Sequence, residues 1–195
     1  MLERTCRPTA ITIRHPVHGH AVLNDQSPMS ERALRMCLDD ELTPADWLAS
    51  LNRRVFFWSD TSGLARLVCA RANRSRAIDV LVIDTLALAM AHAGRIELSP
   101  INSGATIRKP ARRGPSKFTP LLELSYAQWR GKRGGSDRIV EVTVLDGVPD
   151  IARYVSEIRR IEPVECEAVT MLSTTPNATS VVAFIPTQSK TSGPC

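Results

Sequence analysis

Three histidines whose imidazoles could ligate a metal stand close together in the segment HPVHGH. His18 and His20 would point to the same side of an extended segment, and neutral imidazole is a common ligand of zinc, copper and iron. No carboxylate or cysteine cluster follows at ligand spacing, so the sequence predicts no metal site. The favoured alternative is a bend at Pro16 and Gly19 whose histidines face the backbone or solvent. Contact of His15 and His18 with a polar ligand stays open.

Asp25 and Gln26 stand directly before a predicted helix with Pro28 near its start. A carboxylate and an amide beside the unsatisfied donors of a helix N-terminus are suited to holding a nucleotide or a phosphate. The same two side chains are equally suited to capping and orienting the helix. We therefore treat them as candidate ligand-binding residues, with a purely local role as the alternative.

The segment INSGAT combines an amide, two hydroxyls and a glycine in six residues. It follows the end of a predicted strand, where small-ligand contacts are common, and glycine permits a close approach. Asn102, Ser103 and Thr106 are thus candidate ligand-binding residues, although a turn without a ligand also explains them. Trp58, at the end of an aromatic strand, is suited to stacking on a base or a nicotinamide ring. Its alternative place is in the core or at the rim of the sheet.

A basic stretch follows, with eight Lys or Arg residues and one acid, Glu123, between residues 108 and 133. The basic residues are Arg108, Lys109, Arg112, Arg113, Lys117, Arg130, Lys132 and Arg133. Phe118, Tyr126 and Trp129 are interleaved with them, a pattern that can bind nucleic acid by phosphate contacts and stacking. A solvated basic loop explains the stretch equally well. Arg113 is in addition a candidate to line a small-ligand cleft.

Length and composition favour one compact domain. The chain has 195 residues, a mass of 21.4 kDa and 43% hydrophobic residues, which suffice for a core. Five cysteines without a CxxC pair argue against a disulfide framework and favour the cytoplasm. No apolar run reaches membrane-spanning length, so no membrane contact is expected. The net charge of +5 and the pI near 9.2 permit attraction to phosphates without demanding it.

The periodicity of apolar residues predicts an α+β domain over residues 1–162, with a small mixed β-sheet and flanking helices. Helices are predicted from Ser27 or Ser30 to Asp40, from Thr43 to Asn52, from Leu64 to Cys69, from Leu86 to His92 and from Pro149 to Ile161. Strands are predicted for RRVFFW, IDVLVID, RIEL and RIVEVTVL. Residues 104–136 read as a basic loop region, and residues 163–195 as a mobile tail with one short apolar run, VVAFI.

Several of these motifs occur together in one uncharacterised bacterial family that is described only as a domain of unknown function. The resemblance rests on IRHPVHGHAV, NDQSPM, WLASLNRRVFFW, DVLVIDT, IELSPINSGAT, ARRG with a following phenylalanine, and VLDGVPDIARYV, and covers roughly residues 10 to 160. Members of that family carry a further N-terminal segment, so the resemblance implies that this chain begins after it. That segment resembles the first strand of ADP-ribosyltransferase-like folds, which implies an incomplete fold of this type here.

The same resemblance implies a role for Glu141 in the last predicted strand. In an NAD-using transferase, a glutamate on a late strand stabilises the positive charge that develops as nicotinamide leaves. The alternative is a solvent-facing glutamate between Val140 and Val142. The first functional hypothesis is therefore a nucleotide-binding or NAD-using domain with Glu141 as the catalytic residue. The second is a basic protein that binds nucleic acid and catalyses nothing.

Overall fold

The structure is a computed structural model that describes residues 4–17, 19–70, 73–75, 77–106, 110–131, 138–163 and 180–186. The helices are α1 (Glu31–Cys37), α2 (Pro44–Asn52), α3 (Thr61–Val68), α4 (Thr85–His92) and α5 (Tyr126–Gly131). The strands are β1 (Ile11–His15), β2 (Gly19–Leu23), β3 (Arg54–Trp58), β4 (Ile78–Asp84), β5 (Ile96–Ser99), β6 (Thr119–Pro120), β7 (Glu141–Leu145), β8 (Val155–Ile161) and β9 (Ser180–Pro186).

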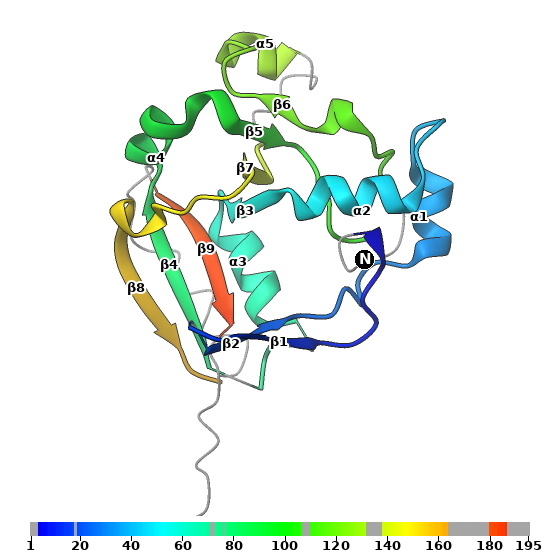
Figure 1. Ribbon diagram of the computed structural model, residues 1–195. Helices are drawn as coiled ribbons and strands as arrows, with labels where there is room; N and C mark the ends of the chain where they lie inside the picture. The colour runs from blue at the N-terminus through cyan, green and yellow to red at the C-terminus, as the bar shows by residue number, and fades with distance from the viewer. Residues whose placement is uncertain are drawn as a thin grey trace, which may run out of the picture.

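A seven-stranded sheet in the order β6-β5-β7-β3-β9-β4-β8 forms the centre of the molecule (Figure 1). Strands β1 and β2 form a separate hairpin. The α+β class with flanking helices is confirmed. The sheet itself differs from the mixed sheet that we expected, because all of its described strand pairs are antiparallel.

Short polar side chains begin four of the helices. Thr43 and Asp46 form a reciprocal capping box at the start of α2, and Ser30 accepts a hydrogen bond from the first turn of α1. Both starts were predicted from the sequence. Asp60, two residues after β3, and Asp84, the last residue of β4, cap α3 and α4 in the same way. The strands therefore turn sharply into helices at one edge of the sheet.

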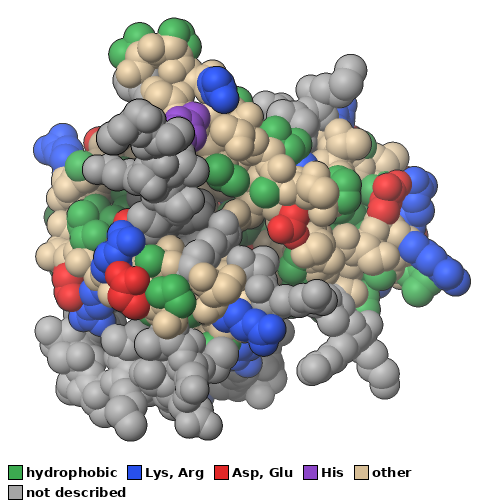
Figure 2. Space-filling view, turned by 90° about the horizontal axis from the view of Figure 1, so that it is seen from below, with side chains coloured by type: hydrophobic (Ala, Val, Ile, Leu, Met, Phe, Trp, Pro, Cys, Tyr) green, Lys and Arg blue, Asp and Glu red, His purple; other side chains and the backbone are tan. Residues whose placement is uncertain are grey.

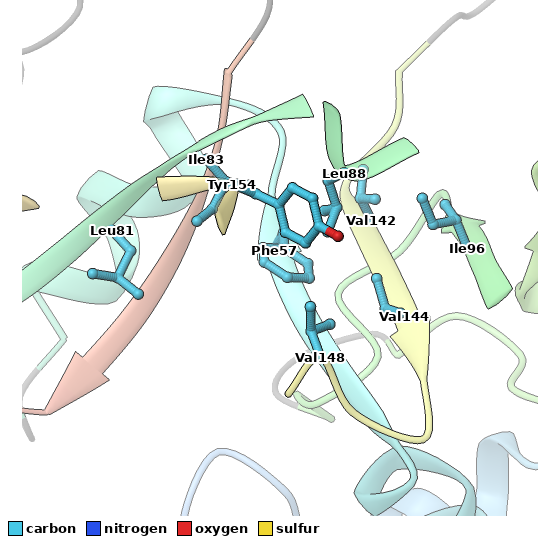
Figure 3. Close-up of a cluster of buried hydrophobic side chains, with 9 residues drawn as sticks. All are labelled: Phe57, Leu81, Ile83, Leu88, Ile96, Val142, Val144, Val148 and Tyr154. Atoms are coloured by element: carbon cyan, nitrogen blue, oxygen red, sulfur yellow. The ribbon is translucent and has the colours of Figure 1, made fainter. Parts of the chain in front are cut away.

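The helices cover both faces of the sheet. On one face, Leu88 of α4 packs with Phe57, Val144 and other apolar residues (Figure 3). On the other face, α1 and α2 enclose a second apolar cluster around Trp47, and α3 packs a third against the start of β4. Because side chains alternate along a strand, Phe57 faces α4 while its neighbour Trp58 faces the α1–α3 side.

The predicted helix from Pro149 to Ile161 is wrong. A 3₁₀ turn spans Ile151–Arg153, and the rest is β8, which pairs with β4 along its length. The apolar residues fit a helical period, but the β-branched residues Val155 and Ile161 also suit an edge strand. The segment forms a strand and not a helix because it pairs with the long apolar strand β4. Sequence periodicity does not predict that pairing.

The prediction of a mobile tail from residue 163 onward is wrong for Ser180–Pro186. These residues form β9, which lies between β3 and β4 in the middle of the sheet. The basic loop region 104–136 also contains regular elements, namely β6 and α5. Every helix in the described ranges is too short or too polar to span a bilayer.

Candidate functional site beneath the INSGAT turn

Glu141, the first residue of β7, lies in the middle of a row of side chains across the sheet. Its cross-strand partners are Ser99 at the end of β5 and Trp58 at the end of β3. Directly opposed residues of an antiparallel pair point to the same face, so all three side chains lie on the α1–α3 side. Two candidate residues far apart in sequence, Trp58 and Glu141, are thus immediate neighbours.

The carboxyl of Glu141 is buried. Its residue is 7% exposed, and Oε1 accepts a hydrogen bond of 3.1 Å from the backbone N–H of Ser103. Burial raises the pKa of this carboxyl to about 7, against the opposing effects of Ser103 and of the Arg113 guanidinium. The solvent-facing alternative for Glu141 is wrong. Strand alternation suggested it, but the INSGAT turn folds back over this end of β7.

Arg113 holds the INSGAT turn from within. Its guanidinium donates to the carbonyl oxygens of Asn102 (3.2 Å) and Ala105, and also to that of Ala111 (2.6 Å). The residue is 2% exposed, so it contacts the protein's own carbonyl groups and presents no charge to solvent. The structure thus places Arg113 at the site without making it part of an open cleft wall.

Thr106 ties the end of the same turn to the start of α1. Its hydroxyl accepts a 2.7 Å hydrogen bond from the Ser30 N–H, and its own N–H donates to the Pro28 carbonyl at 3.0 Å. The NDQSPM and INSGAT motifs therefore pack against each other. Thr106 is 3% exposed, whereas Asn102 is exposed at the tip of the turn.

Three buried polar atoms of these residues make no hydrogen bond of normal geometry among the described residues, although the Ser103 hydroxyl lies near enough to the Glu141 carboxyl to lower its pKa. They are Oε2 of Glu141, Oγ of Ser103 and Nε of Arg113. An unsatisfied buried polar group costs about 1–3 kcal/mol, so such atoms rarely remain without a partner. An acceptor, a hydroxyl and a cationic donor together suit a group that both donates and accepts hydrogen bonds. A carboxyl with a pKa of about 7 exchanges protons readily at neutral pH.

Sequence reasoning missed Ser99, which completes the row beside Glu141 and Trp58. It is fully buried, and its hydroxyl donates to the Ile101 carbonyl at 3.1 Å, which turns the chain from β5 into INSGAT. The Ser-Pro pair directly before INSGAT was the available signal, because serine before proline commonly starts a turn.

The structure does not bring the N-terminal candidates into this cluster by any described contact. His15 accepts a hydrogen bond from the Val17 N–H inside the hairpin turn, in agreement with the predicted bend. His18 lies outside the described residues. Asp25 accepts from the Ser27 N–H in a local turn, and Gln26 pairs with the backbone of Arg7. These contacts anchor the N-terminal segment.

Three of the eight basic residues in the predicted nucleic-acid stretch are engaged within the protein. Arg112 lies 3.5 Å from both Asp39 and Asp40, and Arg113 is buried. Arg130 lies over the ring of Tyr126, with 5.9 Å between the guanidinium carbon and the ring centroid. The remaining members outside the described residues are Arg108, Lys109, Lys132 and Arg133. Figure 2 shows the face of the molecule away from α5, where described acidic and basic side chains lie among one another.

A surface pocket of about 370 Å³ lies elsewhere, between the N-terminal segment and α2. Arg4, Arg53 and Arg54 line it, but each is paired with a carboxylate, so the pocket has no excess of positive charge. We place the candidate site at Glu141, with its unpartnered polar atoms, and not at this surface pocket. Within the described ranges, no three His, Cys, Asp or Glu residues are grouped to hold a metal ion.

Comparison with known proteins gives a family and no biochemistry. No curated protein and no solved structure matches the chain. A family model described as "Family of unknown function (DUF7002)" matches residues 1–155, which include the row at Glu141, the INSGAT turn and the helix contacts around it. The chain therefore belongs to this family of unknown function, DUF7002.

Proposed function

We propose that the chain is a nucleotide-binding domain that uses NAD, with the nicotinamide end of the nucleotide at Trp58 and Glu141. One observation carries the proposal. Glu141 is a buried carboxyl with an unpartnered oxygen and an aromatic cross-strand neighbour. A ring that carries a positive charge is recognised by this pair of groups, through stacking on the indole and attraction to the carboxylate.

The chemistry that this arrangement supports is cleavage of the bond between nicotinamide and ribose. As that bond breaks, positive charge develops on the sugar, and a carboxylate fixed beside it stabilises the charge. The Ser103 N–H holds one oxygen of Glu141, which leaves the other for the substrate. Glu141 is the catalytic residue in this proposal, and Trp58 and Ser103 bind and orient.

Calorimetric titration and thermal unfolding with NAD test the proposal. We expect saturable binding and a rise in the unfolding temperature, because a ligand that binds only the folded state stabilises it. Glu141→Gln should weaken binding by roughly tenfold or more, since it removes a charged partner. Trp58→Leu should weaken it by about ten- to a hundredfold, the usual effect of losing one stacking contact.

Glu123→Gln provides the matched control, because it makes the same chemical change at an exposed acid. It should bind NAD like the unaltered chain. Absence of saturable binding, or an equal loss in Glu123→Gln and Glu141→Gln, would overturn the proposal. We do not propose nucleic-acid binding, because no described contact favours it and the Arg112 and Arg113 charges are engaged within the protein.

A further inference from the structure

Arg113 determines where the hydrogen-bond donor of Glu141 lies. The two carbonyls that its guanidinium holds, those of Asn102 and Ala105, stand on either side of Ser103 in the chain. The Ser103 N–H in turn donates to Oε1 of Glu141. A shift of the guanidinium would therefore move the turn and, with it, the donor that fixes the carboxylate.

Arg113 is itself fixed by its backbone. Its N–H donates to the Cys37 carbonyl and its carbonyl accepts from the Asp39 N–H, each at 2.7 Å, in a bridge to the end of α1. Its Nη1 also approaches the Cys37 thiol at 3.6 Å. The guanidinium thus extends inward from a rigid attachment, and it reaches the INSGAT turn in one defined position.

The unpartnered atoms around this guanidinium define what completes the cluster. The Nε–H of Arg113 needs an acceptor, Oε2 of ionised Glu141 needs a donor, and the Ser103 hydroxyl takes either. A metal cation is disfavoured directly beside the guanidinium, and a small anion directly beside the carboxylate. A water molecule carries the one acceptor and the two donors that these three atoms require, within the usual range for buried water.

We infer that Glu141, Ser103 and Arg113 form an internal site for one water molecule, and that Arg113 is the positioning residue of Glu141 through this water and through the INSGAT turn. The inference rests on the proposed function only for the importance of Glu141. The water bridges the Glu141 carboxylate and the Arg113 guanidinium, so that these two buried charges interact without a direct contact between them. It is also the smallest group that a substrate hydroxyl or amide would replace at Oε2.

The test follows the Glu141 carboxyl by NMR during a pH titration of the chain without NAD. Arg113→Gln removes the nearby positive charge that opposes the effect of burial, so the titration midpoint of Glu141 should shift to higher pH. Arg112→Gln is the matched control, an exposed neighbour whose charge is paired with Asp39 and Asp40. Its midpoint should stay at that of the unaltered chain. Equal midpoints in the two variants would overturn the positioning role.

Arg113→Lys separates charge from geometry. Lysine keeps the positive charge but loses the planar fork, so the midpoint should change little while the Ser103 amide exchanges with solvent roughly tenfold faster or more. Unchanged exchange of this amide would contradict the role of the fork. If a variant at Arg113 does not fold, the measurements on the unaltered chain test the inference instead.

Two NMR measurements on the Ser103 amide of the unaltered chain test the inference without any substitution. The Ser103 amide should shift with the Glu141 titration, because it donates to that carboxyl. It should also show magnetisation transfer from a long-lived internal water. Lack of the water transfer would overturn the water site, and a Ser103 amide insensitive to the titration would overturn the coupling. None of these measurements involves NAD. A negative result would therefore contradict the water site or the positioning role of Arg113 without contradicting the proposed function.

Discussion

A single carboxyl, that of Glu141, links the chemistry of the site to the stability of the fold. Its pKa of about 7 lies above its ordinary value of 4.5 because the folded protein removes it from water. Between these two values the folded state binds more protons than the unfolded state. Protonation therefore favours folding most below pH 4.5, and this contribution is lost as the pH rises to 7.

This difference predicts that the free energy of unfolding falls as the pH is raised from 4.5 to 7 and levels off above 7. The shift corresponds to at most about 3 kcal/mol. Glu141→Gln should abolish this part of the pH dependence, because glutamine does not titrate. Urea unfolding of both proteins across this range measures the difference, and parallel pH curves would show that Glu141 is not the titrating group.

The individual residues of the site were only partly visible in the sequence. The candidates Asn102, Ser103, Arg113 and Glu141 do meet, because INSGAT folds over the start of β7. Burial of Glu141 was not predictable, since period-2 alternation predicts which side of a strand a residue faces but not what covers that side. The basic neighbours of Arg113 in the sequence suggested that it contacts phosphate. In the structure, backbone hydrogen bonds to the end of α1 fix the position of Arg113 inside the protein.

At the scale of the elements, a partly buried ion pair joins two strands that are not neighbours. Arg54 of β3 and Glu97 of β5 approach to 2.8 Å over β7, with side chains 10% and 12% exposed. Arg54 also lies over the Phe118 ring at 4.0 Å. The pair thus holds the β5 side of the sheet, and with it the start of the INSGAT turn, against β3.

Glu97→Ala should lower the free energy of unfolding by about 1–3 kcal/mol, because a partly buried guanidinium loses its carboxylate partner and keeps only Ser50 and the Phe118 ring. Replacing both members, Arg54→Met with Glu97→Met, should recover most of the loss, since no unpaired charge remains buried. Glu157→Ala on the exposed strand β8 is the matched control and should cost well under 1 kcal/mol. Urea denaturation separates the three; equal losses at residues 97 and 157 would refute the importance of burial.

Helices and strands were predictable where their caps and apolar patterns agree with the contacts that they make in the folded protein. Thr43 and Asp46 start α2 and the apolar run of β4 forms a buried strand, because caps and continuous apolar runs leave few alternatives. The segment Val155–Ile161 was not, because its apolar spacing suits both a helix and a strand. Only the neighbouring β4 selects the strand, and that contact is long-range in sequence.

At the scale of the whole molecule, the sheet depends on a strand that comes after a long interval in the chain. β9 pairs with β4 along seven residue pairs and also with the end of β3, so it joins the two halves of the sheet. The sequence did not predict this strand, because serine, threonine and proline dominate the residues on either side of VVAFI.

A chain that ends at residue 179 should therefore lose cooperative unfolding, because β3 and β4 would each expose an unpaired edge in the middle of the sheet. A chain that ends at Pro186 keeps all described strand pairs and is the matched control. Calorimetric unfolding of both measures the effect. A single sharp transition at unchanged temperature in the shorter chain would contradict the central position of β9.

The Glu141 carboxyl carries a proton near neutral pH and contacts the ligand in the proposed function. The most direct test is calorimetric titration with NAD at pH 7 in two buffers of different ionisation enthalpy. If binding ionises Glu141, which is about half protonated at this pH, roughly half a proton should be released per NAD bound. Glu141→Gln should release none. Heats that do not depend on the buffer, or proton release that persists in Glu141→Gln, would contradict the account.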